Sequence, residues 1–154
     1  MAFWLFKQEP DCYSYSDLER DGSTLWDGVT NALALKHLRQ TQPGDQAFFY
    51  HTGAEKAIVG IMKITGMPQA DPNQNDPKRV VVRVAAMRRL TSPVGLAIIK
   101  SDPLFADWEL VRIARLSVMP VSETRWQRIL ALSEGYKDEE RVSSREMKQV
   151  TRKK

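Results

Sequence analysis

The sequence predicts an α+β fold built on a mostly antiparallel sheet. Two strand-forming runs, residues 47–50 and 57–64, follow one another at hairpin distance, and residues 79–90 alternate as a long strand. Segments with helical spacing precede and follow these runs. Because a hairpin pairs its strands antiparallel, we expect it to form the centre of a small barrel or sandwich, with Tyr50 and His51 at the rim.

The N-terminal segment predicts a strand and a short helix. Residues 3–7 are aromatic and aliphatic up to Lys7, which is typical of a strand. The helix begins at Ser14 or Ser16. Ser16 and Glu19 fit a capping box, and Gly22 is well placed to end the helix.

A loop and a second helix follow. Residues 25–31 form the expected loop, in which Asp27-Gly28 supplies the turn and Asn31 caps the next helix. Apolar residues then recur at helical spacing until Pro43 ends the pattern.

The second half of the chain predicts irregular segments around two strands. Residues 66–78 are rich in proline and form a loop, and residues 93–105 form short turns or single-turn helices. Residues 115–121 form a last strand. The helix after it is expected to end at Gly135.

Length and charge favour one domain, residues 1–135, followed by a charged tail, residues 136–154. The net charge is +4, and the tail, with seven basic and four acidic residues, carries +3 of it. The domain is therefore nearly neutral. Any polyanion must bind it through a local patch or a specific pocket.

The cysteine and histidine content and the hydropathy bear on the cellular compartment, on membrane spans and on metal binding. Cys12 is the only cysteine, which predicts a protein of the reducing cytoplasm, and no apolar run reaches the roughly 20 residues of a membrane span. Cys12, His37 and His51 lack the spacing of metal ligands, so we expect no metal and no other cofactor. The oligomeric state stays open, with a monomer as the default.

Two stretches carry candidate site residues. Tyr50 and His51 at a strand end suit hydrogen bonding or acid–base chemistry, but the alternative is a partly buried packing pair. Trp26, beside Asp27 and Asn31, offers a stacking face and edge hydrogen bonds to a planar heterocycle. It can equally be a core residue that anchors the loop. The spacing leaves both alternatives open.

Several motifs, in order from Trp4 to about Leu132, resemble the EVE domain family. They are Trp4-Leu5-x-Lys7-x-Glu9-Pro10, Tyr13-Ser14-x-x-Asp17-Leu18, Trp26-Asp27-Gly28-Val29-x-Asn31, Leu38-Arg39, Gly44-Asp45, Phe49-Tyr50-His51, Val59-Gly60-Ile61 and Arg115-Leu116-Ser117-Val118-x-Pro120-Val121. The resemblance implies a PUA-like fold, a small, mostly antiparallel β-barrel with helices packed around it, related to YTH and ASCH domains. It also implies a non-enzymatic domain that binds DNA or RNA through a pocket for a modified base, with modified cytosine favoured.

The resemblance also implies roles for single residues. Trp26 is expected to stack on the base, while Asp27, Asn31 and the backbone near Val29 read its edge. The remaining pocket wall is expected from Lys7, Tyr50, His51 and Ser117. Candidates for phosphate contact or structural pairing are Arg39 and Arg115.

Two other functions remain open at this point. One is an enzyme in which His51 acts as general base with Lys7 or Glu9. The other is a sensor of small, nucleoside-like molecules that uses the same cavity.

Overall fold

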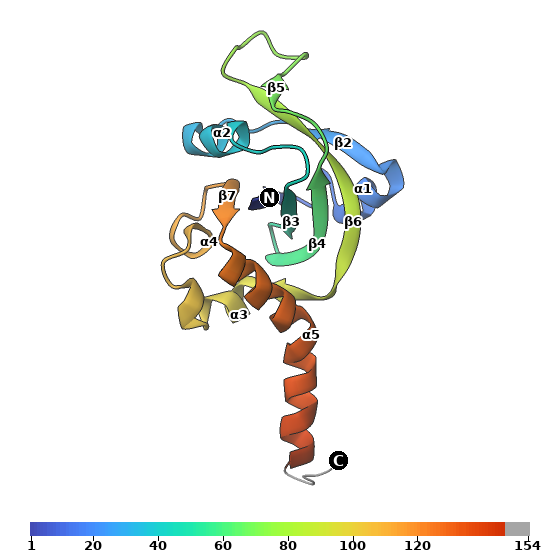
Figure 1. Cartoon of the computed structure of the whole chain (residues 1–154), viewed down its shortest axis with the longest axis vertical. Helices are drawn as coiled ribbons and strands as arrows, with labels where there is room; N and C mark the ends of the chain where they lie inside the picture. The colour runs from blue at the N-terminus through green and yellow to red at the C-terminus, as the bar shows by residue number, and fades with distance from the viewer. Residues whose placement is uncertain (147–154) are drawn as a thin grey trace.

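The computed structural model describes the backbone of residues 1–146 and the side chains of residues 1–135 (Figure 1). This part of the chain forms one mixed sheet of seven strands with five α-helices around it. The strands are β1 (Phe3–Gln8), β2 (Ser23–Trp26), β3 (Gln46–His51), β4 (Ala57–Ile64), β5 (Gln69–Ala70), β6 (Val80–Gly95) and β7 (Val118–Val121). The helices are α1 (Tyr15–Asp21), α2 (Ala32–Arg39), α3 (Leu96–Lys100), α4 (Glu109–Arg112), α5 (Glu123–Glu146) and the 3-10 helix η1 (Pro103–Phe105).

The strand order is β2-β6-β4-β3-β1-β7, and β5 pairs with β6. The predicted α+β class, the hairpin of β3 and β4 and the mostly antiparallel sheet are confirmed. One neighbouring pair, β1 and β3, runs parallel. This pair is important for the site because the carboxyl ends of both strands lie at the same end of the sheet.

The predicted barrel is wrong, because the sheet stays open. Its edges are β2 and β7, and the pairings of the described residues do not join them. Helix α2 packs against both β6 and β7. A helix therefore packs where a barrel would need a strand pair, and Figure 1 shows α2 beyond the start of β7.

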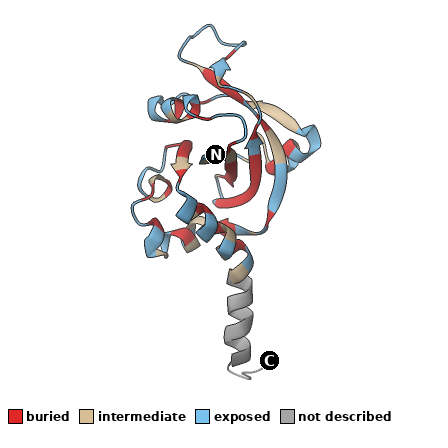
Figure 2. Cartoon of the chain, viewed as in Figure 1, coloured by how far each residue is buried: buried red, intermediate tan, exposed pale blue. Residues whose placement is uncertain are grey.

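The sheet is packed on both faces, as Figure 2 shows for the buried residues of β3 and β4. Successive side chains of a strand alternate between the faces. On one side, here called the Trp26 face, Trp26 contacts Phe6 and Phe49. On the other, the Trp126 face, Trp126 stacks on Phe3 and Phe48. The predicted core positions of Trp4, Trp108 and Trp126 are confirmed.

Some local predictions need correction. The capping box of α1 is Ser14 with Asp17 instead of Ser16 with Glu19, since Tyr15 already belongs to the helix and is fully buried. The end of α1 at Gly22, with a φ of 79°, is confirmed. The loop expected over residues 25–31 begins later, because Trp26 pairs with Val82 of β6.

The last helix also differs from the prediction. Its start is as expected, since the Ser122 hydroxyl accepts a hydrogen bond from the backbone N–H of Arg125. However, α5 continues through Gly135 to Glu146. The side chains of the predicted tail, residues 136–154, lie outside the described residues, so its charge pattern remains a sequence inference.

Candidate functional site

The parallel pair β1 and β3 positions three of the candidate residues, Lys7, Tyr50 and His51. In its register Lys7 lies opposite Tyr50, and Gln8 lies opposite His51. Because side chains alternate along a strand, Lys7 and Tyr50 point to the Trp126 face, and Gln8 and His51 point to the Trp26 face. The predicted single pocket wall is therefore divided between the two faces of the sheet.

A cavity of about 460 Å³ lies beside Trp26. Ligand clefts in proteins typically measure roughly 300–1,000 Å³, so this volume suits a small planar group. We call it the Trp26 cavity. Its lining residues come from the end of β1, the segment before α1 and the end of β2: Gln8, Cys12, Tyr13, Thr24, Leu25, Trp26, Asp27 and Gly28.

Trp26 lies at the boundary between this cavity and the core. Only 3% of the residue is exposed. Its ring lies 5.3 Å from that of Phe6 and, edge-on, 5.2 Å from that of Phe49. Aromatic pairs at this spacing stabilise the interior. Trp26 is therefore a core residue, as one alternative held, and it also lines the cavity, while its stacking on a base stays a prediction.

His51 is a structural residue in this fold. Its Nε2 accepts a hydrogen bond from the backbone N–H of Tyr15 at 3.1 Å. Since Nε2 accepts, the proton of the neutral ring is on Nδ1, which lies 2.8 Å from Glu55 Oε1 and donates to it. The ring contacts Phe49, and 7% of the residue is exposed. Both ring nitrogens are therefore engaged within the protein. His51 does not line the Trp26 cavity, nor the second cavity of the sheet, which contains Lys7.

Tyr15 connects this region to β4 and β6. Its hydroxyl lies 2.7 Å from the carbonyl oxygen of Ile61 and 3.0 Å from that of Arg88. The ring lies flat on Gly60, where an added Cβ would come within 2.6 Å of it. Gly60 is thus required by close packing.

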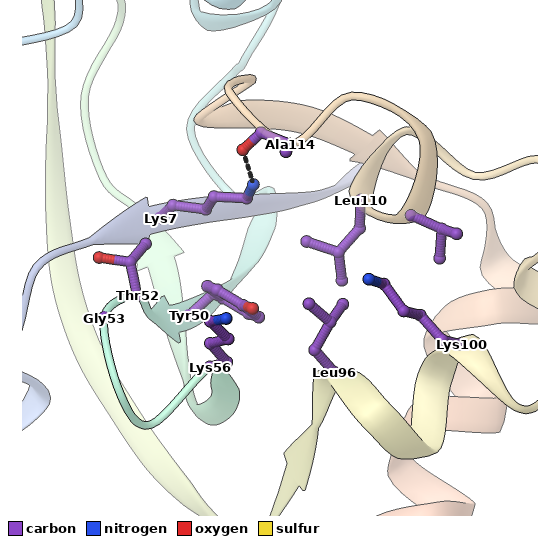
Figure 3. A pocket seen from close by; sticks show the side chains of 10 residues that line it. Lys7, Tyr50, Thr52, Gly53, Lys56, Leu96, Lys100, Leu110 and Ala114 are labelled. Carbon is purple, nitrogen blue, oxygen red and sulfur yellow. Dashed lines mark hydrogen bonds between the residues drawn. The ribbon is translucent and has the colours of Figure 1, made fainter.

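A second cavity, of about 250 Å³, lies on the Trp126 face (Figure 3). We call it the Lys7 cavity. Its lining residues are Lys7, Tyr50, Thr52, Gly53, Lys56, Leu96, Lys100, Leu110, Val111 and Ala114. The Lys7 ammonium donates a hydrogen bond to the carbonyl oxygen of Ala114 at 2.9 Å. It also lies 5.7 Å from the centre of the Tyr50 ring. Burial lowers the pKa of Lys7 and raises that of Tyr50.

The other predicted site residues do not line either cavity. Val29 is buried, and Asn31 caps α2 by accepting from the backbone N–H of Ala34 at 3.0 Å. Arg39 donates to the carbonyl oxygen of Lys78 at 2.9 Å, which favours structural pairing over phosphate contact. The backbone oxygen of Ser117 accepts from the N–H of Lys7 at 2.9 Å, and Arg115 is exposed.

Sequence reasoning missed several lining residues. Gln8 and Thr24 could have been found from strand alternation once their strands were placed. Lys56 and Lys100 have no sequence pattern that marks them as site residues, because a surface lysine in a loop or at a helix end is ordinary. Only the packing of α3 beside the hairpin brings both of them to Lys7.

Two other features, a metal site and a membrane-spanning helix, are not found among the described residues. Among their side chains, no group of three or more His, Cys, Asp or Glu residues is arranged to hold a metal ion. None of the helices in the described part combines the length and the apolar character needed to cross a membrane.

Fold and cavities together define an α+β domain whose open sheet carries small clefts at the carboxyl end of one parallel strand pair. The EVE domain family matches residues 2–132. The chain therefore belongs to the EVE domain family. Thymocyte nuclear protein 1 of Homo sapiens is 31% identical, in an alignment that covers 86% of this chain and 74% of that protein.

Solved structures agree with this assignment. Rpa0253 from Rhodopseudomonas palustris is 36% identical, with a TM-score of 0.82 over 86% of this chain and 93% of that one. Human THYN1 in complex with 5-methylcytosine-containing DNA is 29% identical, with a TM-score of 0.79 over 87% of this chain and 98% of that one. The ASCH structure from Zymomonas mobilis, at 10% identity and a TM-score of 0.58 over 85% of this chain and 95% of that one, shares the fold alone.

Proposed function

We propose that this protein binds DNA that contains a modified cytosine, and that the modified base enters the Trp26 cavity. The observation that carries the proposal is the similarity to human THYN1, whose structure was solved with 5-methylcytosine-containing DNA. The matched region covers nearly the whole of that chain. A second line of support is the chemistry of the Trp26 cavity itself.

The cavity lining fits the edge of a cytosine. Cytosine presents an N4 amino donor, and a carboxylate is a suitable acceptor for it. Asp27 is exposed and lines the cavity, which supports its carboxylate as the acceptor of this bond. The Gln8 amide and the Thr24 hydroxyl offer further hydrogen bonds. A methyl group at C5 would find apolar contacts at Leu25 and Trp26.

Entry of the base requires that it leave the stack of the nucleic acid. This costs a few kcal/mol in a duplex and less in a single strand. The cavity offers ring contact and edge hydrogen bonds in return, which is the combination that a flipped base needs. We therefore assign Asp27 the main contact with the base edge, and Trp26, of which 3% is exposed, a smaller contact with the ring.

The proposed role is binding without catalysis. The enzyme alternative needs His51 as a general base, but its two ring nitrogens already bond to Tyr15 and Glu55. We assign the binding role to residues 1–135. A cytoplasmic location remains a proposal from the lone Cys12, while the relatives of this chain bear the name of a nuclear protein.

The test compares single-stranded oligonucleotides that carry 5-methylcytosine, cytosine or thymine at one position. Thymine has the same methyl group but an acceptor in place of the N4 amino group. The wild type is expected to prefer 5-methylcytosine over both. Asp27→Ala should lose most of its preference over thymine, about 5- to 150-fold for a contact of roughly 1–3 kcal/mol.

Glu123→Ala is the matched control, because it removes the same charge from an exposed position at the start of α5. It should keep the wild-type preferences. A wild type that binds the three oligonucleotides equally would refute the proposed function. A folded Asp27→Ala variant with unchanged preferences would refute the assignment of Asp27.

A further inference from the structure

The Lys7 cavity carries positive charge that the base-binding role does not use. Lys7, Lys56 and Lys100 line it, and they come from β1, the turn after β3 and the end of α3. Residues 1–135 contain sixteen basic and fifteen acidic residues in total. Three lysines around one hollow are therefore a strong local excess in a nearly neutral domain.

The acidic groups around the cavity are few. None of the lining residues is an aspartate or glutamate. Glu9 reaches the rim, where its Oε1 accepts a hydrogen bond from the Thr52 hydroxyl at 3.1 Å. That bond fixes Thr52 and leaves the ammonium groups of the three lysines without a carboxylate partner in the cavity wall. The electrostatic potential in the hollow favours an anion.

The cations are partly positioned in advance. The hydrogen bond to Ala114 uses one N–H of the Lys7 ammonium and leaves two for a ligand. Lys56 has a φ of 46°, and its carbonyl oxygen accepts from the N–H of Leu96, which ties the turn to α3. Figure 3 shows Lys100 extending from α3 toward Leu110. Groups that are already held lose less entropy when they bind a ligand.

The position of the cavity points to the identity of the anion. Lys7 lines this cavity, and the next residue, Gln8, lines the Trp26 cavity on the opposite face. Both hollows thus open at the same end of the sheet, separated by the last residues of β1. The backbone of a DNA strand that places one base in the Trp26 cavity must continue past this end.

We propose that the Lys7 cavity binds a backbone phosphate of a nucleotide that flanks the modified cytosine. This inference rests on the proposed function. The three ammonium groups and the Tyr50 hydroxyl contact the phosphate oxygens, and the apolar wall of Leu96, Leu110 and Val111 packs against the adjacent deoxyribose. Phosphate contacts position a nucleic acid without reading its sequence.

The experiment measures DNA affinity as a function of salt for the full chain and its variants Lys56→Gln and Lys100→Gln. Loss of one phosphate contact should flatten the slope of log K against log salt by about 0.9 for a duplex or about 0.7 for a single strand. Both variants should weaken binding to modified and unmodified DNA by the same factor. Lys63→Gln, an exposed lysine at the other end of the same hairpin, is the matched control and should behave like the wild type.

The outcomes separate this inference from the proposed function. If Lys56→Gln and Lys100→Gln keep the wild-type slope while folded, the cavity does not hold a DNA phosphate. If the slope changes but wild-type preference for 5-methylcytosine is absent, the phosphate site stands and the base assignment fails. Melting curves of each variant confirm that it is folded.

Two further experiments identify which phosphate the Lys7 cavity binds. Replacing the phosphates on either side of the modified cytosine by uncharged methylphosphonates should remove the difference between the wild type and Lys100→Gln. Replacing phosphates at the ends of the oligonucleotide should not. Inorganic phosphate and deoxycytidine monophosphate are titrated separately. If they bind in a Lys100-dependent manner while the DNA slope stays unchanged, the site serves a free phosphate and the proposal is overturned.

Discussion

The two faces of the sheet differ most clearly at the ends of β1 and β3. On the Trp26 face, Phe6, Phe49 and His51 pack closely with Trp26 and Tyr15, and the cavity beside Trp26 carries one carboxylate, that of Asp27. On the Trp126 face, three lysines surround a hollow with apolar walls. The two faces thus differ in charge, with a carboxylate from the residue after β2 on one and lysines from β1, the turn after β3 and α3 on the other.

This difference in charge between the two faces shows how a nearly neutral domain can offer a local positive patch to a polyanion. Strand alternation separates side chains that are adjacent in the chain by the thickness of the sheet. The Trp26 cavity is accordingly lined without lysine or arginine, while Lys7, one residue before Gln8, lies with two other lysines on the opposite face. The predictions below test this division of roles.

The largest effect is expected for Trp26→Ala. Removal of this buried ring should lower the free energy of unfolding by about 3–5 kcal/mol, a large fraction of the stability of a typical domain. Leu96→Ala, in the wall of the Lys7 cavity, should cost clearly less because that side chain is only partly buried. Urea unfolding of both variants provides the measurement.

An equal loss of unfolding free energy in both variants would contradict the view that the Trp26 face is closely packed and the Lys7 cavity is hollow. A folded and fully stable Trp26→Ala variant that no longer binds DNA would show that the indole is a free platform for the base. Trp26→Phe keeps a ring in the core and is therefore the better variant for binding assays.

A smaller effect is expected for His51→Ala. It leaves the buried N–H of Tyr15 without its acceptor, which should cost about 1–3 kcal/mol. Glu55→Gln keeps an oxygen that can accept from His51 Nδ1, and it should change the stability by less than about 1 kcal/mol. Chemical denaturation, followed by an affinity measurement on the folded variant, checks both. Full stability of His51→Ala with lost DNA affinity would place His51 in the binding surface.

The smallest effect concerns pH. Burial lowers the pKa of Lys7 below its ordinary value of 10.5. The folded protein therefore disfavours the charged form, and the associated loss of stability is present below the folded-state pKa. It disappears as the pH rises from that pKa toward the unfolded value. The stability of the wild type relative to Lys7→Met should accordingly increase with pH across this alkaline window.

Unfolding curves at several alkaline pH values, together with Lys63→Met as an exposed reference, measure this effect. A difference between the wild type and Lys7→Met that does not change with pH would show that the ammonium is solvated like an ordinary surface lysine. The Lys7 cavity would then be more open to water than its geometry indicates.

The amino-acid sequence determined much of this protein by itself. The hairpin of β3 and β4, the cap at Asn31 and the stop at Gly22 depend on residues close together in the chain, whose preferences act locally. The family was also recognisable, because its motifs keep their order and spacing from Trp4 onward.

The tertiary structure decided the rest. The open sheet goes with the packing of α2 against β6 and β7, and the burial of Trp26 depends on its contacts with Phe6 and Phe49. The parallel register of β1 and β3 brings Lys7 beside Tyr50 and Gln8 beside His51, and α3 brings Lys100 to the Lys7 cavity. Each of these results comes from contacts between residues far apart in the chain, and local preferences do not encode such contacts.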